Sequence, residues 1–494
     1  MAEKYYLLAM DYGAESGRGV LVTLNKNTGV PTVEMEEIHR LPNRPVRMGG
    51  TLYWDFPFLF AELLATLRKC AERGITLSGI GVDTWGVDFG LLGADDRLLG
   101  NPVHYRDSRT DGIHDYSNPV MKQGKVFEYT CCEPWSISSL FQVLAMQKQN
   151  SPLLPLATTF LQMPDLFNFF LTGQKASERS IASTGNLMGA DGEWSREVID
   201  AFKLPAMFGR MVEPGTLLGP LSEEVQALTG LGAVPVVATC GHDTSAVAAA
   251  VPAQGQNWSF LSSGTWSIVG KLRDKPVTTP EAYAQGFCNE YTLNNWFICR
   301  NILGLWLVQE LKRKWDKESD PWDYNRITAA AAEAPSGPML DVADGRLLAP
   351  ADMEETLYTL LAELGQPKPE SRGALVRCVL ESLALEYAWR LDSLDAITGS
   401  KTESLYIVGG GVANKLLCQF TANACARPTF AGASECTALG NALTQAVGLG
   451  LLSGPDEIRQ VMRGSLGLTP YESQDTEAWK EKRAAYDRIK KARA

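Results

Sequence analysis

Two segments far apart in the sequence carry the same β-hairpin pattern, and this repetition constrains the fold more than any other feature. The first segment reads as a strand at Tyr5–Met10, a polar turn at 11–18 and a second strand at Gly19–Leu24. The second segment, Trp258–Gly270, places two apolar runs around a turn of Ser, Gly and Thr residues. A repeated unit of this kind predicts two related domains that meet near residues 245–255.

Strand and helix patterns alternate in the rest of the chain. Apolar residues recur at helical spacing over Phe58–Arg73, and a strand pattern follows at Leu77–Val82. Farther on, the apolar run Val234–Cys240 stops at Gly241–Thr244, and a helix is predicted over Ser245–Val251. This alternation is typical of an α/β architecture. The other predicted elements are a strand at Thr32–His39, a helix over Ala374–Leu394, a strand at Ser404–Val408, a helix from Val412, a helix over Glu435–Val447 and a charged surface helix at Thr476–Lys491.

The length of the chain and its net charge limit the number of domains and the kinds of partner that we expect. At 494 residues the chain is long enough for two or three domains, each with its own core. We expect an N-terminal domain at 1–245, a second domain at 246–452 and a helical tail at 453–494. The 46 Lys and Arg residues against 57 Asp and Glu residues leave a net charge of −11, which argues against nucleic acid as a partner.

The sequence also predicts where the protein works. Only six uncharged residues separate Lys4 from Asp11, too few for the apolar core of a signal peptide. No apolar run approaches the roughly 20 residues needed to cross a bilayer, so we expect a cytosolic protein without a membrane partner. The ten cysteines are scattered and are expected to be buried thiols, and with four histidines a zinc site is not expected. The sequence does not predict the oligomeric state.

The turn of the first hairpin has the composition of a phosphate-binding loop. Gly13 and Gly17 let backbone N–H groups approach an anion closely, and Arg18 adds a positive charge. Asp11, at the end of the preceding strand, can hold a metal ion. The turn Ser262–Thr265 offers donors of the same kind, so two loops, one from each domain, could bind one triphosphate. A Gly-rich turn without a ligand is the alternative for each loop.

The run Gly409–Gly411, between a predicted strand and a helix, is a third element typical of nucleotide sites. Glycines at such a position let a ribose or a flat ring lie against the backbone. The run does not match a dinucleotide fingerprint, because Asn414 stands in the place of the third glycine, and the sequence contains no P-loop pattern. Close packing of a helix on a strand is the alternative.

Asp243 is the best candidate for a catalytic residue. It stands where an apolar strand ends and a helix begins, near the positive end of that helix and the predicted domain junction. In phosphoryl transfer through a loose transition state, the acceptor hydroxyl gives up its proton late, so a solvated carboxylate suffices as the base. From position alone, a helix N-cap is the more common role for an Asp at such a point.

Two further segments mix charged and aromatic residues. Asp83–Phe89 contains two carboxylates and two aromatic rings around Gly86, which suits a polyol or sugar site. We nevertheless interpret it as a buried tryptophan flanked by solvated acids. Arg106–Arg109 could orient a substrate, but its local sequence favours an ordinary cluster of surface ion pairs.

Taken together, these motifs resemble those of the FGGY carbohydrate kinases, which have the actin/Hsp70/sugar-kinase fold. The resemblance covers nearly the whole chain and depends on Asp11–Arg18, Gly241–Thr244, Ser262–Trp266 and Ile407–Gly411, in this order and spacing. It implies an α/β protein with two ribonuclease H-like domains and a central cleft. It also implies ATP, Mg²⁺ and a small ketose as ligands.

The resemblance further implies roles for individual residues. Asp243 would be the base that accepts the proton of the sugar hydroxyl, and Asp11 would help to position Mg²⁺. Glu15 departs from the family's pattern, because a negative charge beside a triphosphate is unfavourable unless its side chain points away. The sugar would be lined by Gly86, His242, Asp243, Thr244 and Asn301, and ATP would be bound by Ala14, Glu15, Ser16, Gly17, Arg18, Thr265, Gln309, Gly409, Gly410 and Gly411.

Within the family, three segments are most similar to the members that phosphorylate L-rhamnulose on its 1-hydroxyl in L-rhamnose catabolism. These segments are Asp83–Phe89, Tyr105–Thr110 and Asn301–Trp306. Another ketose, such as L-fuculose or D-xylulose, is the nearest alternative, since stereochemistry at one or two carbons depends on contacts that the sequence does not show. An ATPase of the same superfamily without a sugar site, and a dinucleotide-dependent oxidoreductase, are the remaining alternatives.

Overall fold

The computed structural model describes residues 3–26 and 29–493 of the chain. It contains two compact units, each made of three segments. Both units combine helices with a mixed sheet, which confirms the predicted α/β class with two domains. The domain boundaries at 245/246 and 452/453 and the central cleft stay predictions. The first unit comprises Met1–Pro252, Leu272–Ile298 and Cys436–Ser465, and the second comprises Ala253–Lys271, Cys299–Glu435 and Leu466–Ala494.

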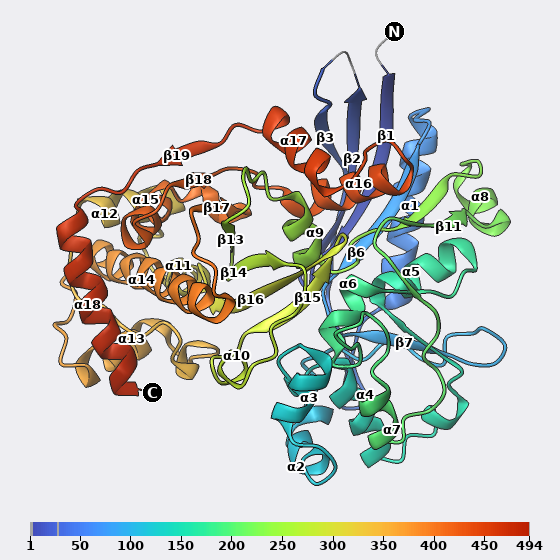
Figure 1. Ribbon diagram of the computed structural model, residues 1–494, viewed down its shortest axis with the longest axis horizontal. Helices are drawn as coiled ribbons and strands as arrows, with labels where there is room; N and C mark the ends of the chain where they lie inside the picture. Colours follow the sequence, from blue (N-terminus) through green and yellow to red (C-terminus); the bar gives the residue numbers. More distant parts are fainter. Residues whose placement is uncertain (1–2, 27–28, 494) are drawn as a thin grey trace. The chain divides into compact units, whose positions relative to one another are not determined.

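A six-stranded mixed sheet forms the centre of the first unit (Figure 1). Its strands lie in the order β11 (Thr216–Pro220), β12 (Pro235–Ala238), β6 (Gly79–Thr84), β1 (Glu3–Tyr12), β2 (Ser16–Lys26) and β3 (Thr32–Pro42). β1 pairs with β2 in antiparallel orientation and with β6 in parallel orientation, and β12 also runs parallel to β6. Because neighbouring parallel strands end on the same side of a sheet, the carboxyl ends of β1, β6 and β12 lie together.

Helix α1 (Phe56–Glu72) covers one face of this sheet. The carboxylate of Asp55 caps the helix, which is why it begins two residues before the predicted start. Leu59, Leu63 and Leu67 recur at helical spacing and are buried. They belong to the same core as Met10 of β1, so this face of the sheet is apolar.

Helix α16 (Cys436–Gly448) contacts β1 and β6 on the opposite face. Side chains alternate along a strand, so Asp11 and Asp83 point away from the apolar face and toward the side that α16 covers. The helix approaches closely, because a Cβ on Gly81 of β6 would lie 2.6 Å from Oδ1 of Asn441 on α16. Helix α9 (Asp243–Ala250), which follows β12, packs on α16 in turn.

The first unit contains further short elements around this frame. Its other strands are β4 (Val46–Met48), β5 (Thr51–Tyr53), β7 (Phe89–Leu92), β8 (Thr159–Gln162), β9 (Ser177–Glu178), β10 (Met211–Val212) and β15 (Cys288–Thr292). Its other helices are α2 (Ile113–Ser117), α3 (Gln123–Thr130), α4 (Ser139–Lys148), α5 (Met163–Thr172), α6 (Arg179–Ala182), α7 (Arg196–Ala201), α8 (Glu223–Thr229), α10 (Pro280–Ala284) and α17 (Pro455–Ser465).

The second unit repeats the hairpin arrangement of the first. β13 (Trp258–Ser263) pairs with β14 (Trp266–Arg273) in antiparallel orientation and with β17 (Ser404–Val408) in parallel orientation, as β1 pairs with β2 and β6. The repetition predicted from the sequence is therefore confirmed at the level of strand pairing. The sheet continues with β18 (Thr429–Ala431) and β19 (Thr469–Tyr471) beyond β17, and with β16 (Asn295–Leu303) beside β14.

The long helix α14 (Arg372–Thr398) forms the core of the helical part of the second unit. Most of its side chains are buried, and it packs against α12 (Tyr324–Glu333) and α15 (Lys415–Cys425). The predicted helix over Ala374–Leu394 is thus confirmed. The remaining helices of this unit are α11 (Trp306–Trp315), α13 (Met353–Glu363) and α18 (Thr476–Arg493).

Two expectations for the second unit need correction. The helix predicted from Val412 begins later, because residues Gly410–Ala413 form a 3₁₀ turn and Oδ1 of Asn414 caps α15 by accepting a hydrogen bond from N of Leu417. Helix α18 is also more than a surface helix, since Trp479 and Tyr486 are buried.

Two other sequence-based expectations can be compared with the structure. All ten cysteines are buried, as predicted. Over residues 3–26 and 29–493, none of the helices combines the length and the apolar character required to span a bilayer.

Candidate active site

Three aspartates gather at the carboxyl ends of the parallel strands of the first unit. Asp11 of β1 and Asp83 of β6 are paired in the strand register. The segment after β12 reaches the same place, because His242 forms a parallel bridge with Thr84, the last residue of β6. Asp243 comes next in the chain, and its charge acts on both other carboxylates. The sheet topology therefore places Asp83 beside Asp11 and Asp243, the two acids that the sequence analysis proposed as functional.

Arg18 balances part of this negative charge. It stands opposite Asp11 in the β1–β2 register, and its Nε and Nη2 donate to Oδ2 of Asp11 at 2.9 and 2.8 Å. Burial nevertheless raises the pKa of Asp11, against the lowering effect of Arg18, and the charge of Asp243 raises it further. One arginine is therefore not enough to keep all the carboxylates of the cluster charged.

Asp83 is the most deeply buried member of the cluster. Nδ2 of Asn441 donates to its Oδ2 at 2.6 Å, whereas its buried Oδ1 has no hydrogen-bond partner. Burial and the negative charge of Asp11 raise the pKa of Asp83 well above its ordinary value. An unsatisfied carboxylate oxygen in a cluster of acids fits the oxygen donors that Mg²⁺ prefers.

The described residues do not form a complete metal site by themselves. Within 3–26 and 29–493, no group of three or more His, Cys, Asp or Glu side chains is arranged to hold a metal ion. Mg²⁺ in nucleotide enzymes is usually held by one or two carboxylates together with phosphate oxygens and water. The carboxylates around Asp11 fit a site of this kind, in which phosphate oxygens and water complete the coordination of Mg²⁺.

Asp243 is not the N-cap that its position suggested. His242 has the extended N-cap conformation, and Asp243 is the first residue of α9. Its Oδ1 accepts hydrogen bonds from N of Thr244 and, at 3.1 Å, from Oγ1 of Thr244. The Asp243 side chain keeps 35% of its surface exposed, so it can meet a substrate.

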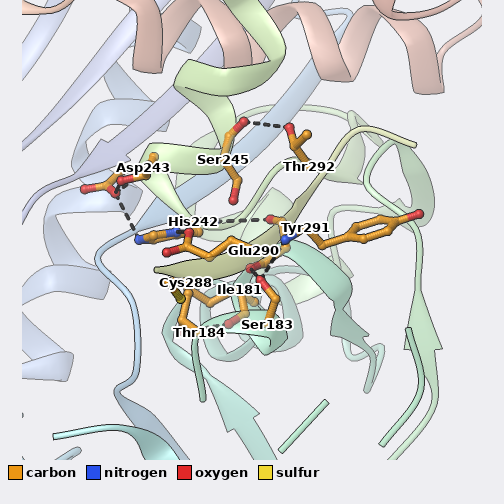
Figure 2. A network of polar contacts seen from close by, with 12 residues as sticks. Ile181, Ser183, Thr184, His242, Asp243, Ser245, Cys288, Glu290, Tyr291 and Thr292 are labelled. Atoms are coloured by element: carbon orange, nitrogen blue, oxygen red, sulfur yellow. Dashed lines mark hydrogen bonds and ion pairs between the residues drawn. The ribbon is translucent and has the colours of Figure 1, made fainter. Parts of the chain in front are cut away.

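His242 links Asp243 to a glutamate that the sequence analysis did not identify (Figure 2). Nδ1 of His242 lies 2.8 Å from Oε2 of Glu290 on β15, and Nε2 lies 3.3 Å from Oδ1 of Asp243. Burial alone would lower the pKa of His242, but the charges of Glu290, Asp243 and Glu178 raise it to about 9. The imidazole therefore stands between two carboxylates as a cation at neutral pH.

The turn after β6 is strained where Gly86 meets a neighbouring side chain. A Cβ on Gly86 would lie 3.2 Å from the side chain of Thr184, so a larger residue needs this neighbour to move. Val87 has a φ of 69°, which β-branched residues rarely adopt, and its N donates to Oγ1 of Thr184 at 3.1 Å. Backbone strain of this kind is common at ligand sites.

The interpretation of Asp83–Phe89 as carrying solvated acids was wrong. Asp83 and Asp88 are both fully buried. Oδ2 of Asp88 accepts from the indole nitrogens of Trp54 at 2.6 Å and Trp85 at 3.0 Å, and burial raises the pKa of Asp88 to about 6 against these bonds. The hydrogen bonds from the indole N–H groups offset part of the free-energy cost of burying this carboxylate.

The interpretation of Arg106–Arg109 as surface ion pairs was also wrong for two of its members. Asp107 is buried and accepts hydrogen bonds from the backbone nitrogens of Leu52 and Arg109. The Arg109 side chain donates from Nη2 to Oε1 of Gln142. The segment thus reaches into the interior of the first unit, and only Arg106 and Ser108 of these four residues are exposed.

The first predicted phosphate loop is a tight turn. N of Gly13 donates to the carbonyl of Ser16 at 2.9 Å, and a Cβ on Gly17 would lie 2.5 Å from the ring of Tyr12. A glycine is therefore needed at position 17 for the loop to pack on β1. The side chain of Glu15 is exposed, which is the condition under which its charge is tolerated beside a polyphosphate.

In the second unit, the predicted nucleotide residues gather at the ends of β13 and β17. Nε2 of Gln309 donates to Oγ1 of Thr265 at 3.1 Å, and N of Gly304 donates to the carbonyl of Thr265. A Cβ on Gly411 would lie 2.1 Å from Oγ of Ser263, whereas Gly410 faces open space. Gly409 has a φ of 83°. The glycine run thus packs against the hairpin turn and keeps one open backbone position.

The structure groups the predicted residues within each unit. Asn301 lies on β16 and is partly buried. Glu178, Thr184, Glu290 and Asn441 are polar residues of the site that no motif indicated, since each comes from a separate part of the chain. In the first unit the structure places Asp11, the loop 14–18, Gly86, His242, Asp243 and Thr244, and in the second it places Thr265, Asn301, Gln309 and Gly409–Gly411.

Comparison with protein families matches the chain to two related domain descriptions. Residues 6–250 match the N-terminal domain of the FGGY family of carbohydrate kinases, and residues 260–449 match the C-terminal domain of the same family. Together these ranges cover most of the chain.

Curated relatives match over nearly their full length. A rhamnulokinase of Bacteroides thetaiotaomicron is 40% identical over 479 residues, which is 96% of this chain and 97% of the relative. A rhamnulokinase of Halalkalibacterium halodurans is 34% identical and covers 96% of this chain and 100% of the relative.

Solved structures show the same fold at low sequence identity. A ligand-bound xylulose kinase from Lactobacillus acidophilus has a TM-score of 0.82 at 15% identity, and the match covers 99% of this chain and 98% of the other. A glycerol kinase from Plasmodium falciparum with ADP has a TM-score of 0.80 at 15% identity, with the same coverage.

Proposed function

Because the chain belongs to the FGGY family of carbohydrate kinases, we propose that it transfers the γ-phosphoryl group of ATP to the 1-hydroxyl of L-rhamnulose. The observation that carries this proposal is the full-length similarity to two rhamnulokinases, at 40% and 34% identity. The similarity to xylulose and glycerol kinases, at 15% identity, supports the fold alone.

Asp243 is the general base in this proposal. Its exposed carboxylate accepts the proton of the sugar hydroxyl as the hydroxyl oxygen attacks the γ-phosphorus and the bond to the ADP oxygen breaks. Because the proton leaves late in a loose transition state, the carboxylate mainly orients the hydroxyl. The partly exposed position of Asp243, at the start of α9 and next to the buried acids, supports this role.

The sugar side of the site comes from residues around Asp243 and Gly86. Gly86 leaves the backbone after β6 accessible, and the strained Val87 fixes its turn. His242 and Thr244 flank Asp243 and line the proposed sugar site, and the hydroxyl oxygen of Thr244, which donates its proton to Asp243, can accept a hydrogen bond from a sugar hydroxyl. Asn301 of the second unit adds an amide in the proposed site. These groups are the donors and acceptors that a polyol requires.

The nucleotide side comes from the two hairpin turns and the glycine run. Arg18 and the backbone N–H groups of 14–17 suit the phosphates, while Thr265, Gln309 and Gly409–Gly411 of the second unit suit the rest of ATP. Asp11 would hold Mg²⁺, and the ion would neutralise charge on the phosphate oxygens. The raised pKa values of Asp11 and Asp83 show that these buried acids lack a compensating positive charge, and this supports a cation at this place.

A panel of ketoses tests the proposed acceptor. We expect ADP release with L-rhamnulose to exceed that with L-fuculose and D-xylulose by about 10-fold or more in kcat/KM, because an unmatched hydroxyl leaves polar groups of the site unpaired. ATP consumption should be negligible without sugar. Equal rates with and without sugar would favour an ATPase without a sugar site, and a preference for another ketose would replace the proposed acceptor.

Gln309 tests the nucleotide side. Gln309→Leu should raise KM for ATP by roughly 3- to 10-fold and leave KM for the ketose unchanged, because it removes the hydrogen bond that holds Oγ1 of Thr265. Lys312→Gln, on the same helix, is the matched control, since Lys312 pairs with Asp316 and has no proposed role. An unchanged KM for ATP in Gln309→Leu would remove Gln309 from the ATP site.

A further inference from the structure

A glutamate outside every recognised motif contacts the residue beside the proposed base. We propose that Glu290 is a positioning residue for phosphoryl transfer, which orients His242 so that its Nε2 stays paired with Oδ1 of Asp243 and leaves Oδ2 to face the acceptor hydroxyl. This inference rests on the proposed function. It assigns a role to a side chain that touches neither the sugar nor ATP in that proposal.

Both ring nitrogens of His242 face carboxylate oxygens (Figure 2). Nδ1 lies 2.8 Å from Oε2 of Glu290, and Nε2 lies 3.3 Å from Oδ1 of Asp243. A carboxylate accepts hydrogen bonds and donates none, so Nδ1 needs a proton to bond Glu290. Nε2 lies at ion-pair distance from Asp243, and a neutral ring that is protonated on Nδ1 would present a lone pair to this negative oxygen. The geometry therefore favours the doubly protonated ring.

The charges around His242 favour this protonated ring. Three carboxylates face it: Glu290 on β15, Asp243 on α9 and Glu178 on β9. Burial opposes the cation, yet these three charges together raise the pKa of His242 to about 9. Glu290 is the largest of the three contributions and the only one with a short hydrogen bond to the ring.

The strand that carries Glu290 is fixed to the rest of the site. N of Tyr291 donates to Oγ of Ser183 at 3.0 Å, and Oγ1 of Thr292 donates to the carbonyl of Ser245 on α9 at 2.8 Å. β15 is thus tied to the helix whose first residue is Asp243. A carboxylate on such a frame can set the ring plane of His242 within the tolerance that catalysis needs.

The consequence for Asp243 is a difference between its two oxygens. Oδ1 accepts hydrogen bonds from N and Oγ1 of Thr244 and forms an ion pair with the imidazole of His242. These three contacts all fall on one oxygen of the Asp243 carboxylate. Oδ2 is left to accept the sugar proton, and the two hydrogen bonds and the ion pair oppose rotation of the carboxylate.

The substitution Glu290→Gln tests the role of the charge. The amide keeps the shape and can still accept from Nδ1, but His242 loses its strongest anionic partner. We expect kcat with L-rhamnulose to fall roughly 10- to 100-fold at pH 8, with KM for sugar and ATP within about twofold of the wild type. The wild-type rate should hold up to about pH 9, where His242 loses its proton. In the variant the rate should begin to fall at a lower pH than in the wild type as the pH is raised, because the largest of the charges that raise the pKa of His242 is gone.

A second glutamate–histidine pair provides the control. Oε2 of Glu62 on α1 lies 2.6 Å from Nε2 of His39 on β3, away from the proposed site. Glu62→Gln makes the same chemical change and should leave kcat, KM and the pH profile unchanged. A loss of activity in both variants would indicate a general effect of neutralising a glutamate paired with a histidine and would overturn the role of Glu290.

Titration of His242 by NMR gives a readout that does not depend on activity. The chain has four histidines, so labelling at Cε1 and the substitution His242→Gln identify the signal. Its midpoint should be near pH 9 in the wild type and should move to lower pH in Glu290→Gln. An unchanged midpoint or an unchanged rate profile in Glu290→Gln would overturn the inference. If the wild type phosphorylates no ketose while the midpoint shifts as expected, the proposed function and the positioning role fail, and the Glu290–His242 ion pair remains.

Discussion

Replacing Asp243 with asparagine is expected to lower kcat by about 10²- to 10⁴-fold while the chain still binds the ketose and ATP. The amide has nearly the same size as the carboxylate, and Oδ1 can still accept from Thr244. It cannot take a proton from the acceptor hydroxyl. The loss should therefore appear in kcat, measured by ADP release, and only weakly in the dissociation constants, measured by calorimetry.

The matched control for this variant is Asp323→Asn. Asp323 stands at the start of α12 and caps it, much as Asp243 stands at the start of α9. Asparagine is as good an N-cap as aspartate, so stability and rate should stay at wild-type values. Full turnover in Asp243→Asn would show that Asp243 is not the general base, independently of the result for Asp323→Asn.

Replacing Gly440 with alanine is expected to destabilise the first unit by about 2 to 4 kcal/mol. Gly440 lies on α16 where this helix crosses α9, and a Cβ there would lie 2.0 Å from the carbonyl oxygen of Ala246. A backbone carbonyl inside a helix cannot move aside as a flexible side chain can. The helices must separate, which would also displace Asp243 at the start of α9. Urea denaturation and kcat should both report the change.

Gly464→Ala is the corresponding control. Gly464 lies near the end of α17, and a Cβ there would meet Cγ1 of Val30 at 3.5 Å, an ordinary contact distance. Alanine has a higher helix propensity than glycine, so this variant should be unchanged or more stable by up to about 1 kcal/mol. Equal stabilities for the two variants would show that α9 and α16 are not packed as closely as the structure has them.

The fold could be predicted where local pattern decides it. The apolar runs around short Gly-containing turns predicted both hairpins, and Asp11 and Asp243 were found because each ends or follows a predicted strand. Parallel strand order then brings such ends together, so the site follows from the topology. Asp83 also ends a strand, and the same reasoning applied to three neighbouring strands would have grouped it with the other two acids.

Residues whose environment comes from distant segments could not be predicted. Asp88 looks like a surface acid in its own segment, and its burial depends on the indole of Trp54 and the amide of Gln142. Arg109 likewise depends on Gln142. Glu290 lies in a strand without any motif, and its role appears only when β15 is placed beside His242. These contacts cannot be inferred from the spacing of residues in the sequence.

The most direct test is a crystal structure of Asp243→Asn with L-rhamnulose and a non-hydrolysable ATP analogue. The account predicts that the 1-hydroxyl of the sugar lies within about 3.2 Å of the side chain at position 243, in line with the terminal phosphorus. A sugar bound with a different hydroxyl at this position, or bound away from residue 243, would contradict it.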